Sequence, residues 1–411
     1  MKHDSKINKN IWHVGIMSLI LVFVTTFVAV VSPVQAAKSV SQTAISTYLA
    51  AQSNPALSDQ QKIKAAIDAY FTTRYEGQKT LQTQDFSAIL SDTTQPWVKK
   101  EQDKRDIEIY VAKRFNLQYI SYKYKLTYNA INIKNDVAIV RLFESHNVIF
   151  KVIAPVVSKL SDLQHIFTLK RTKNSWTIYR DEYQDEFSQQ FDHMTKANTQ
   201  SRIDANYQAQ QALIANESDD FVLPATTNTY NRTAAVYYAA SYPTYGHRNL
   251  AYKSMYFRDG YGGDCTNYVS QILYAGAPKM NNTGVKGTGW WYNTKGTISP
   301  PIANTNDDTF SNSWSVVSYM FSFLTTNTSH GPYGIKTTIC GILPGDVIQL
   351  NNGVQWFHEV VLQENLHIDY NCSNPVNYVI IGHDTDRFKY PLTYYTALYK
   401  LRYIHIMGWR P

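Results

Sequence analysis

The stretch Tyr261-Gly262-Gly263-Asp264-Cys265-Thr266-Asn267-Tyr268 contains the strongest local signal in this chain. Two adjacent glycines allow the backbone to turn sharply, and Asp264 stands where a helix N-cap is expected. Apolar residues recur at helical spacing after Cys265, so the pattern predicts a helix that begins at the cysteine. A thiol there lies beside free backbone N–H groups and the positive end of the helix dipole, which predicts a lowered pKa and a nucleophile. A small buried side chain in an ordinary helix is the alternative interpretation.

A histidine far downstream is the natural partner of this cysteine. His358 falls within the apolar run Trp356-Phe357-His358-Glu359-Val360-Val361-Leu362, which predicts a strand. A helix-borne nucleophile and a strand-borne base lie far apart in sequence but meet in the fold, and a third polar group holds the imidazole in register. We therefore interpret His358 as the base. A hydrogen-bonded core histidine is the alternative.

The segments between residues 228 and 411 follow one another in the order of a known family. The stretch from Asp264 to Gln271 is followed by Leu343-Pro344-Gly345-Asp346-Val347, then by the strand of His358 and by Gly382-His383-Asp384. This region resembles the putative amidase domain family, a branch of the papain-like cysteine hydrolases similar to the NlpC/P60 cell-wall peptidases. The resemblance implies an α+β fold in which a helix bearing the cysteine packs on an antiparallel sheet bearing the histidines.

The resemblance also implies roles for single residues. A polar residue in the position of His383 orients the base, which would make Cys265, His358 and His383 the catalytic set. Asp384 and Asp386 compete with His383 for that role, and a turn-capping His-Asp pair is the alternative for His383 itself. The implied activity is hydrolysis of amide bonds in peptidoglycan or envelope peptides through a thioester on Cys265, without a cofactor.

Other residues near the motifs are candidates for supporting roles. The backbone N–H of Cys265 is the natural oxyanion donor, and the Tyr261 hydroxyl is a second candidate. We interpret Asp264 as the helix cap and Asp384 as a supporting residue. Three tryptophans are candidates to line a substrate groove, with core packing as the alternative: Trp290, Trp291 and Trp314.

No metal site is predicted. His358-Glu359 begins like the zinc-binding H-E-x-x-H helix, but Leu362 stands where the second histidine belongs. A metal-dependent hydrolase that uses His358, His383 and a cysteine or carboxylate is the second hypothesis. A catalytically inactive wall-binding protein on the same scaffold is the third.

Residues 1–36 have the pattern of an export signal. Three lysines precede an apolar run from about Val14 to Val31, and the small-residue site Val34-Gln35-Ala36 follows. The run is also just long enough to span a bilayer, so a retained N-terminal anchor is the alternative. We expect a secreted, extracytoplasmic protein associated with the cell wall, in contact with a membrane only through this segment if it is uncleaved.

The charge of the chain agrees with such a location. Removal of residues 1–36, which hold three lysines and Asp4, lowers the formal net charge from +7 to +5 (7 − 3 + 1). A mildly basic protein is attracted to an anionic wall, whereas this charge is too small and too dispersed to predict nucleic-acid binding. We expect peptidoglycan or a peptide as the partner and a monomer as the state of the protein.

The three cysteines are an odd number, which outside the cell indicates a reactive thiol or an unpaired residue. A disulfide between Cys340 and Cys372 would leave Cys265 free to react. Two separate reduced cysteines fit the sequence equally well.

The N-terminal part of the chain predicts a separate domain. Helical patterns near 58–70, 86–90 and 95–115 are followed by alternating segments from about residue 120 to 180, which predict an antiparallel meander. We therefore expect an α+β domain over residues 38–182, with a nuclear-transport-factor-2-like or cystatin-like fold as one candidate. A polar, helix-prone linker over 183–227 then leads to the papain-like amidase domain at 228–411.

Overall fold

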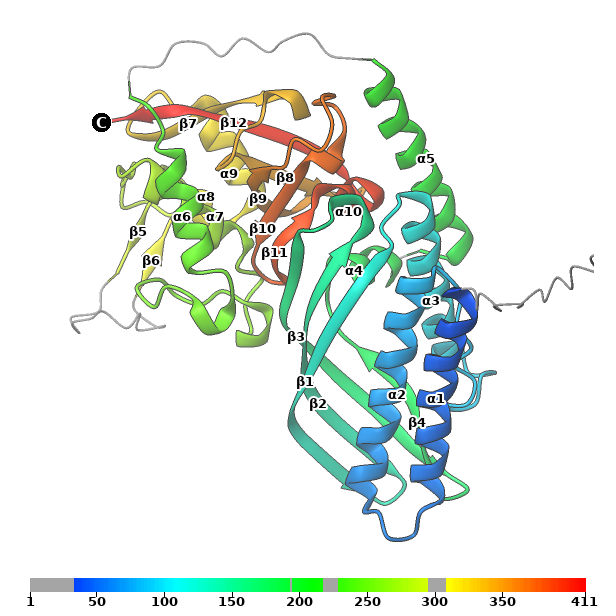
Figure 1. Ribbon diagram of the computed structural model, residues 1–411. Coiled ribbons are helices and arrows are strands. Elements are labelled where there is room, and N and C mark those ends of the chain that lie inside the picture. Colours follow the sequence, from blue (N-terminus) through cyan, green and yellow to red (C-terminus); the bar gives the residue numbers. More distant parts are fainter. Residues whose placement is uncertain (1–32, 193, 217–227, 295–307) are drawn as a thin grey trace, which may run out of the picture.

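The computed structural model describes residues 33–192, 194–216, 228–294 and 308–411 (Figure 1). Most of the predicted export signal therefore lies outside the described residues, and the small-residue site at 34–36 falls within the first described helix, α1 (Pro33–Ser53). Among the described residues, none of the helices has the length and apolar character needed to cross a bilayer.

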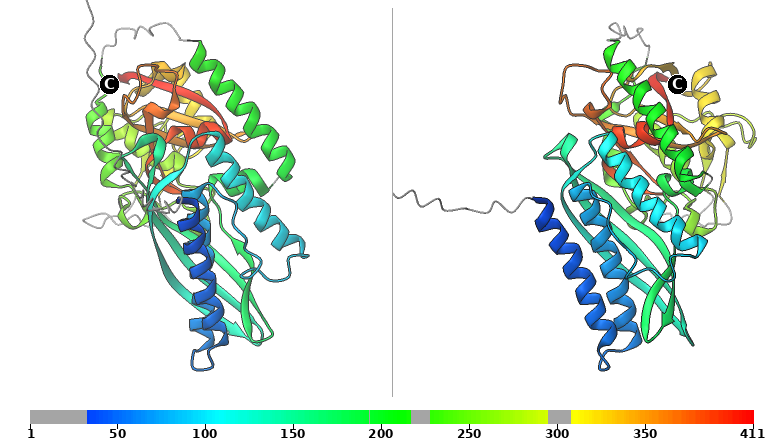
Figure 2. Two further views of the ribbon diagram at one scale, coloured as in Figure 1. Left: turned by 45° about the vertical axis from the view of Figure 1, so that its right-hand side comes forward. Right: turned by 90° about the vertical axis from the view of Figure 1, so that its right-hand side faces the viewer.

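The N-terminal half packs three helices against a curved antiparallel sheet. Helix α1 lies beside α2 (Asp59–Thr80), and α2 lies against the sheet (Figures 1 and 2). Ser58 and Gln61 form a capping box that starts α2, because each side chain satisfies a free backbone N–H group of the first turn. The remaining elements are α3 (Pro96–Arg114), β1 (Tyr119–Lys134), β2 (Val137–Phe150), η1 (Lys151–Ile153), β3 (Val157–Thr172) and β4 (Ser175–Glu182).

The helical stretch expected near 86–90 is a turn instead. Leu90 pairs with Ile178 of β4 through an isolated bridge, and the Asp85 side chain accepts the N–H of Ser87. These tertiary and local hydrogen bonds outweigh the helical pattern, which is too short to form a stable helix alone.

The segment expected to be a linker contains two helices, α4 (Glu186–Asp192) and α5 (Lys196–Ala215). Helix α5 packs against both halves of the molecule. Asp204 of α5 accepts a hydrogen bond from Tyr110 of α3, and Asn206 donates to the backbone carbonyl of Ala397 in the C-terminal half. The stretch 217–227 lies outside the described residues.

The C-terminal half packs the cysteine helix, α7 (Cys265–Gly276), against β9 (Trp356–Asn365) and β10 (Tyr378–Gly382). Val269, Ile272 and Leu273 are buried, as the helical spacing predicts. The other helices are α6 (Arg232–Ser241), η2 (Tyr245–His247), η3 (Phe257–Asp259), α8 (Asn312–Ser315), α9 (Val317–Thr326), η4 (Ile339–Gly341), η5 (Pro375–Asn377) and α10 (Leu392–Leu398). The other strands are β5 (Tyr292–Asn293), β6 (Thr309–Phe310), β7 (Gly331–Thr337), β8 (Val347–Asn351), β11 (Asp386–Pro391) and β12 (Lys400–Arg410).

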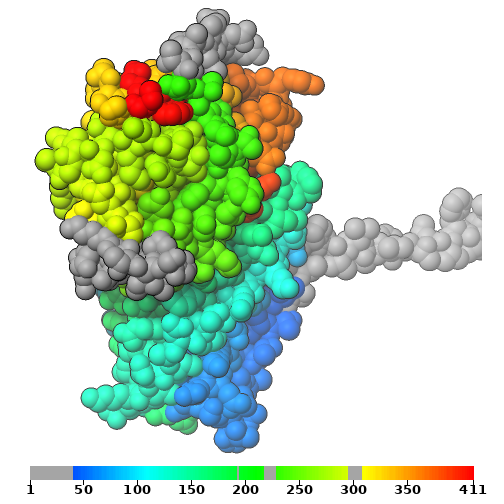
Figure 3. All heavy atoms as spheres, turned by 90° about the vertical axis from the view of Figure 1, so that its left-hand side faces the viewer, coloured from blue at the N-terminus to red at the C-terminus, as the bar shows by residue number. Residues whose placement is uncertain are grey.

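One sheet runs through both halves. Its order is β1-β2-β3-β11-β10-β9-β8-β12-β7, with β4 on β3, so it has ten strands among the described residues. The halves join where β11 pairs antiparallel with β3, with Asp386 opposite Ser161 and Arg387 opposite Leu160. In the space-filling view the C-terminal half lies directly on the N-terminal half (Figure 3). The fold is therefore α+β with a mostly antiparallel sheet, which confirms the predicted class at this level.

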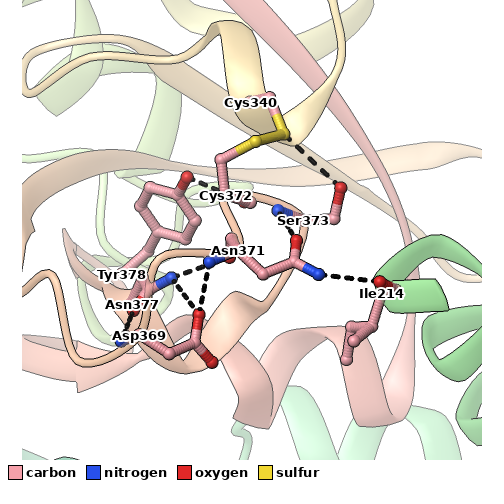
Figure 4. Close-up of a disulfide and its surroundings, with 8 residues drawn as sticks. All are labelled: Ile214, Cys340, Asp369, Asn371, Cys372, Ser373, Asn377 and Tyr378. Carbon is pink, nitrogen blue, oxygen red and sulfur yellow. Dashed lines mark hydrogen bonds between the residues drawn. A yellow bond between two sulfur atoms is a disulfide. The ribbon is translucent and has the colours of Figure 1, made fainter. Parts of the chain in front are cut away.

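A disulfide joins Cys340 to Cys372, and Cys265 is the free cysteine of the described residues. The loop of Cys372 also meets the end of α5, because the Asn371 side-chain amide donates to the carbonyl of Ile214 at 2.7 Å (Figure 4). The crosslink thus holds the loop on which α5 ends.

Replacement of Cys340 and Cys372 together by serine should lower the free energy of unfolding by about 4 kcal/mol, because the crosslink spans a sequence separation of 32 residues. The midpoint of urea unfolding measures the change. Dithiothreitol should lower the midpoint of the wild type and of Cys265→Ala to a similar extent, and it should leave the double variant unchanged. An insensitive wild type would show that the crosslink does not stabilise the fold.

Candidate functional site

Cys265 begins α7 directly after a glycine turn. Gly263 has φ 125°, and a Cβ atom there would lie 2.7 Å from Oδ2 of Asp384, so only glycine lets that carboxylate approach. The cysteine side chain is 6% exposed. The turn therefore places a nearly buried thiol at a helix N-terminus with a carboxylate against the backbone beside it.

The structure brings Cys265 and His358 together, as the sequence interpretation requires. His358 projects from β9, and its ring shares the site with Asp384, which follows β10. The thiol, one ring nitrogen and one carboxylate oxygen all lie within 4.8 Å of one another. Nucleophile, base and a carboxylate thus converge from three separate segments.

His383 does not join this group, contrary to our expectation that it orients the base. Its Nδ1 lies 2.8 Å from the Asp264 carboxylate, and its Nε2 lies 2.8 Å from the backbone carbonyl of Tyr242. The ring also stacks on Tyr268 of α7. Burial opposes the charge of this imidazole, but the hydrogen bond to Asp264 raises the pKa of His383 above its usual value. Both ring nitrogens of His383 are therefore hydrogen-bonded to other groups. His383 stabilises the turn before α7 and does not orient the ring of His358.

Asp264 is not the side-chain cap that the sequence predicts. It precedes α7, but its carboxylate makes no capping hydrogen bond there. One oxygen accepts the N–H of Met255 and the side-chain amide of Asn267, each at 2.9 Å, and the other contacts His383. The carboxylate thus ties the turn to the preceding loop at Met255, to Asn267 of α7 and to His383.

The backbone N–H of Cys265, the expected oxyanion donor, is hydrogen-bonded to the Asp384 carboxylate. Its carboxylate accepts the backbone N–H of Asp264 at 2.7 Å and that of Cys265 at 3.2 Å. Asp384 itself has φ 82°, an unusual conformation for a residue with a side chain. Burial, with repulsion from Asp264, raises the pKa of Asp384 to about 7. Asp386 contacts Tyr245 and Tyr256 instead.

The pKa of the thiol shifts in the direction opposite to our prediction. Burial raises the pKa of Cys265 well above its usual value, and the carboxylates of Asp384 and Glu359 add to that effect. Burial also lowers the pKa of His358. The helix N-terminus favours a thiolate, but desolvation and two acidic neighbours outweigh it. The resting pair is therefore a neutral thiol beside a neutral imidazole.

The aromatic candidates lie elsewhere. Trp290, Trp291 and Trp314 are buried in the C-terminal half, so they do not line a groove as we had considered. Trp290 donates to Ser270 and Trp314 donates to Asn267, both on α7, which explains their burial: they hold the cysteine helix in place. Tyr261 is 39% exposed, and its ring faces the Lys253 amine at 4.4 Å.

A cavity of about 590 Å³ opens between the two halves, and Asp384 is one of its lining residues, whereas Cys265 and His358 do not line it. Its walls come from α3, β3 and β4 on one side and from the loop 256–258 on the other. Acidic side chains line the cavity together with aromatic and basic ones. The aromatic and basic residues include Trp97, Lys104, Arg180, Tyr183 and Arg258. Sequence analysis missed this cavity, because its walls are far apart in the chain and meet only through the joined sheet.

The same three groups that converge on the thiol also form a metal-type donor set. Cys265, His358 and Asp384 offer a thiolate, an imidazole and a carboxylate, which together suit zinc. This set differs from the predicted alternative because His383 is engaged elsewhere.

Comparisons with known proteins locate the similarity in the C-terminal half. The family described as "Putative amidase domain" matches residues 229–407, as the motifs predicted. The "Uncharacterized protein YhbB" of Bacillus subtilis (strain 168) is 31% identical over 120 residues, which are 29% of this chain and 32% of that protein. The chain thus spans about a third of this curated relative. No solved structure shows a significant match.

Asp384→Asn should lower the pKa of the Cys265 thiol, because it removes an adjacent carboxylate that opposes the thiolate. Asparagine tolerates a positive φ, and its one amide oxygen can still accept one of the two backbone N–H groups that Asp384 accepts. A unit charge within about 5 Å contributes on the order of 1–4 kcal/mol, so alkylation by iodoacetamide at pH 8 should accelerate about tenfold or more.

The rate of alkylation measured from pH 6 to 10 checks this shift. Asp386→Asn is the matched control, since Asp386 lies two residues away and hydrogen-bonds Tyr245 and Tyr256. An unchanged profile for Asp384→Asn would mean that this carboxylate does not act on the thiol.

Proposed function

We propose that this part of the chain hydrolyses amide bonds with Cys265 as the nucleophile, because residues 229–407 match the family described as "Putative amidase domain". The family description supports a hydrolase that acts on C–N bonds. The observation that carries the cysteine mechanism is the convergence of the Cys265 thiol and the His358 imidazole within 4.8 Å at the start of α7.

In the first half of the reaction, sulfur attacks the amide carbonyl while His358 takes the thiol proton. This concerted transfer suits a neutral resting pair, because a free thiolate is disfavoured in this buried position. The tetrahedral intermediate collapses as the imidazolium gives its proton to the leaving nitrogen. The C–N bond breaks, an amine leaves, and a thioester remains on Cys265.

In the second half, water attacks the thioester and His358 accepts a proton from it. Breakdown of the second intermediate releases the carboxylic acid and returns the proton to the sulfur. Atoms balance over the cycle, since one amide and one water give one acid and one amine.

The Cys265 N–H group is the proposed oxyanion donor in both halves. Asp384 accepts that N–H in the resting structure, so the substrate oxygen has to displace the carboxylate. With the pKa of Asp384 raised to about 7, protonation of the carboxyl near neutral pH weakens its hold on the N–H group.

We propose the peptide of peptidoglycan, an envelope peptide, as the substrate of a secreted, wall-associated enzyme. The pattern of residues 1–36 supports export. The cavity is lined by aromatic side chains and by charged side chains of both signs, such as Trp97, Arg180 and Asp162, which offer donors and acceptors to a peptide. This assignment of substrate and location rests on those two observations.

A metal-dependent hydrolase is the second candidate, because Cys265, His358 and Asp384 form a suitable donor set. A metal bound there would polarise the carbonyl or a water molecule. The two candidates respond differently to reagents. A chelator abolishes the activity of the metal enzyme, whereas prior removal of metal does not protect the cysteine enzyme from iodoacetamide.

Cys265→Ala should lower the release of amines from purified cell wall by at least about a thousandfold, because no other group replaces the nucleophile. His358→Ala should lose activity to a similar extent. The matched control is the variant with serine at both Cys340 and Cys372, assayed below its unfolding temperature, which should keep its turnover. Wild-type activity in Cys265→Ala would refute the mechanism, and loss with chelator alone would favour the metal candidate.

A further inference from the structure

We propose that Glu186, which lies outside the matched region in the N-terminal half, is the positioning residue for His358. The inference rests on the proposed cysteine mechanism and adds the group that orients its base. Glu186 begins α4, in the segment expected to be a linker. The two catalytic side chains and their orienting carboxylate would thus come from different halves of the chain.

A carboxylate lies beside one ring nitrogen of the imidazole. Oε1 of Glu186 lies 3.8 Å from Nε2 of His358, within ion-pair distance. That nitrogen is buried and has no hydrogen-bond partner among the described residues. A buried, unpaired ring nitrogen is costly, so the carboxylate beside it is its natural partner when the ring becomes charged.

Glu186 is held firmly in this position. Nε and Nη2 of Arg387 contact its Oε2 at 3.1 and 3.0 Å, and the Tyr395 hydroxyl donates to Oε1 at 3.1 Å. Tyr399 donates to the backbone carbonyl of the same residue. Glu186 and Arg387 are each 2% exposed. A carboxylate fixed by two elements of the C-terminal half can orient a ring without a large entropic cost.

The three residues considered as orienting groups from the sequence all have hydrogen bonds of their own. His383 uses both ring nitrogens on Asp264 and Tyr242. Asp384 accepts two backbone N–H groups, and Asp386 accepts from Tyr245 and Tyr256. On the proposal, Glu186 takes the orienting role for which His383, Asp384 and Asp386 were considered, because its carboxylate lies 3.8 Å from Nε2.

The charges around His358 give Glu186 a definite effect. The ring is faced by Cys265 from α7, Asp384 from the end of β10, Glu186 from α4 and Arg387 from β11. Burial opposes the charge of Glu186, but Arg387 outweighs it and lowers the pKa of that carboxyl, so Glu186 is ionised. Burial lowers the pKa of His358 and Arg387 adds to that effect, while the Glu186 carboxylate opposes the shift. Glu186 therefore stabilises the imidazolium that forms when sulfur attacks.

Glu186→Gln tests the proposal, because it keeps the size of the side chain and removes the charge. We expect kcat for amine release to fall about 10- to 100-fold with little change in KM. Loss of the carboxylate should lower the pKa of His358, so the imidazole stays neutral to a lower pH. The acid limb of the pH profile should therefore move to lower pH. Glu186→Asp, which keeps the charge, should retain the position of the limb.

Glu364→Gln is the matched control. Glu364 lies on the same strand as His358, but it pairs with Lys389 at 2.7 Å on the surface, so its replacement should leave kcat and the pH profile unchanged. Urea unfolding of every variant separates a loss of activity from a loss of fold. If Glu186→Gln fails to fold, Glu186→Asp carries the test through kcat: the shorter side chain withdraws the carboxylate from Nε2, so kcat should fall, and a wild-type kcat would overturn the proposal.

The outcomes separate this proposal from the mechanism on which it rests. Wild-type kcat and pH profile in a folded Glu186→Gln, with Cys265→Ala inactive, would overturn the role of Glu186 and leave the cysteine mechanism standing. A uniform loss of activity with an unshifted limb would make Glu186 a purely structural residue, which also overturns the proposal. Full activity of Cys265→Ala would overturn both.

Discussion

The pairing of β3 with β11 is the interaction on which the rest of the architecture depends. It joins a meander from the N-terminal half to the sheet that carries His358, through backbone hydrogen bonds between distant parts of the chain. Arg387 lies on the joined strand, and from there its guanidinium holds Glu186 beside the imidazole. The same junction forms the walls of the cavity that reaches Asp384. The register of β3 with β11 therefore fixes where Arg387, and with it Glu186, lies at the site.

The site itself is organised by burial. Desolvation keeps Cys265 and His358 neutral, and it raises the pKa of Asp384 to about 7 even though that carboxylate accepts two N–H groups. A buried group stays ionised where an ion pair offsets the free-energy cost of removing it from water, as Arg387 does for Glu186. The resting site thus holds its reactive groups uncharged and places a fixed charge where the imidazolium would form.

Sequence analysis identified the two residues whose surroundings are local. Cys265 follows a glycine turn at the start of an apolar helix, and His358 lies in an apolar strand, so both patterns are visible within a few residues. The choice between His383 and Asp384 beside the thiol could not be made in this way, because adjacent residues after a strand point in different directions. The burial of Trp290 and Trp314 depends on contacts with α7 that have no sequence signature.

The sequence by itself determined the α+β class, the helix that starts at Cys265, the strand of His358 and the resemblance of the C-terminal half to an amidase family. These features depend on short-range periodicity and turn chemistry, which neighbouring residues encode directly. Only the tertiary structure decided that one sheet joins the two halves, that Asp384 occupies the Cys265 N–H group, and that Glu186 faces His358. Those contacts link residues more than a hundred positions apart, and chain closure together with desolvation, rather than local propensity, selects them.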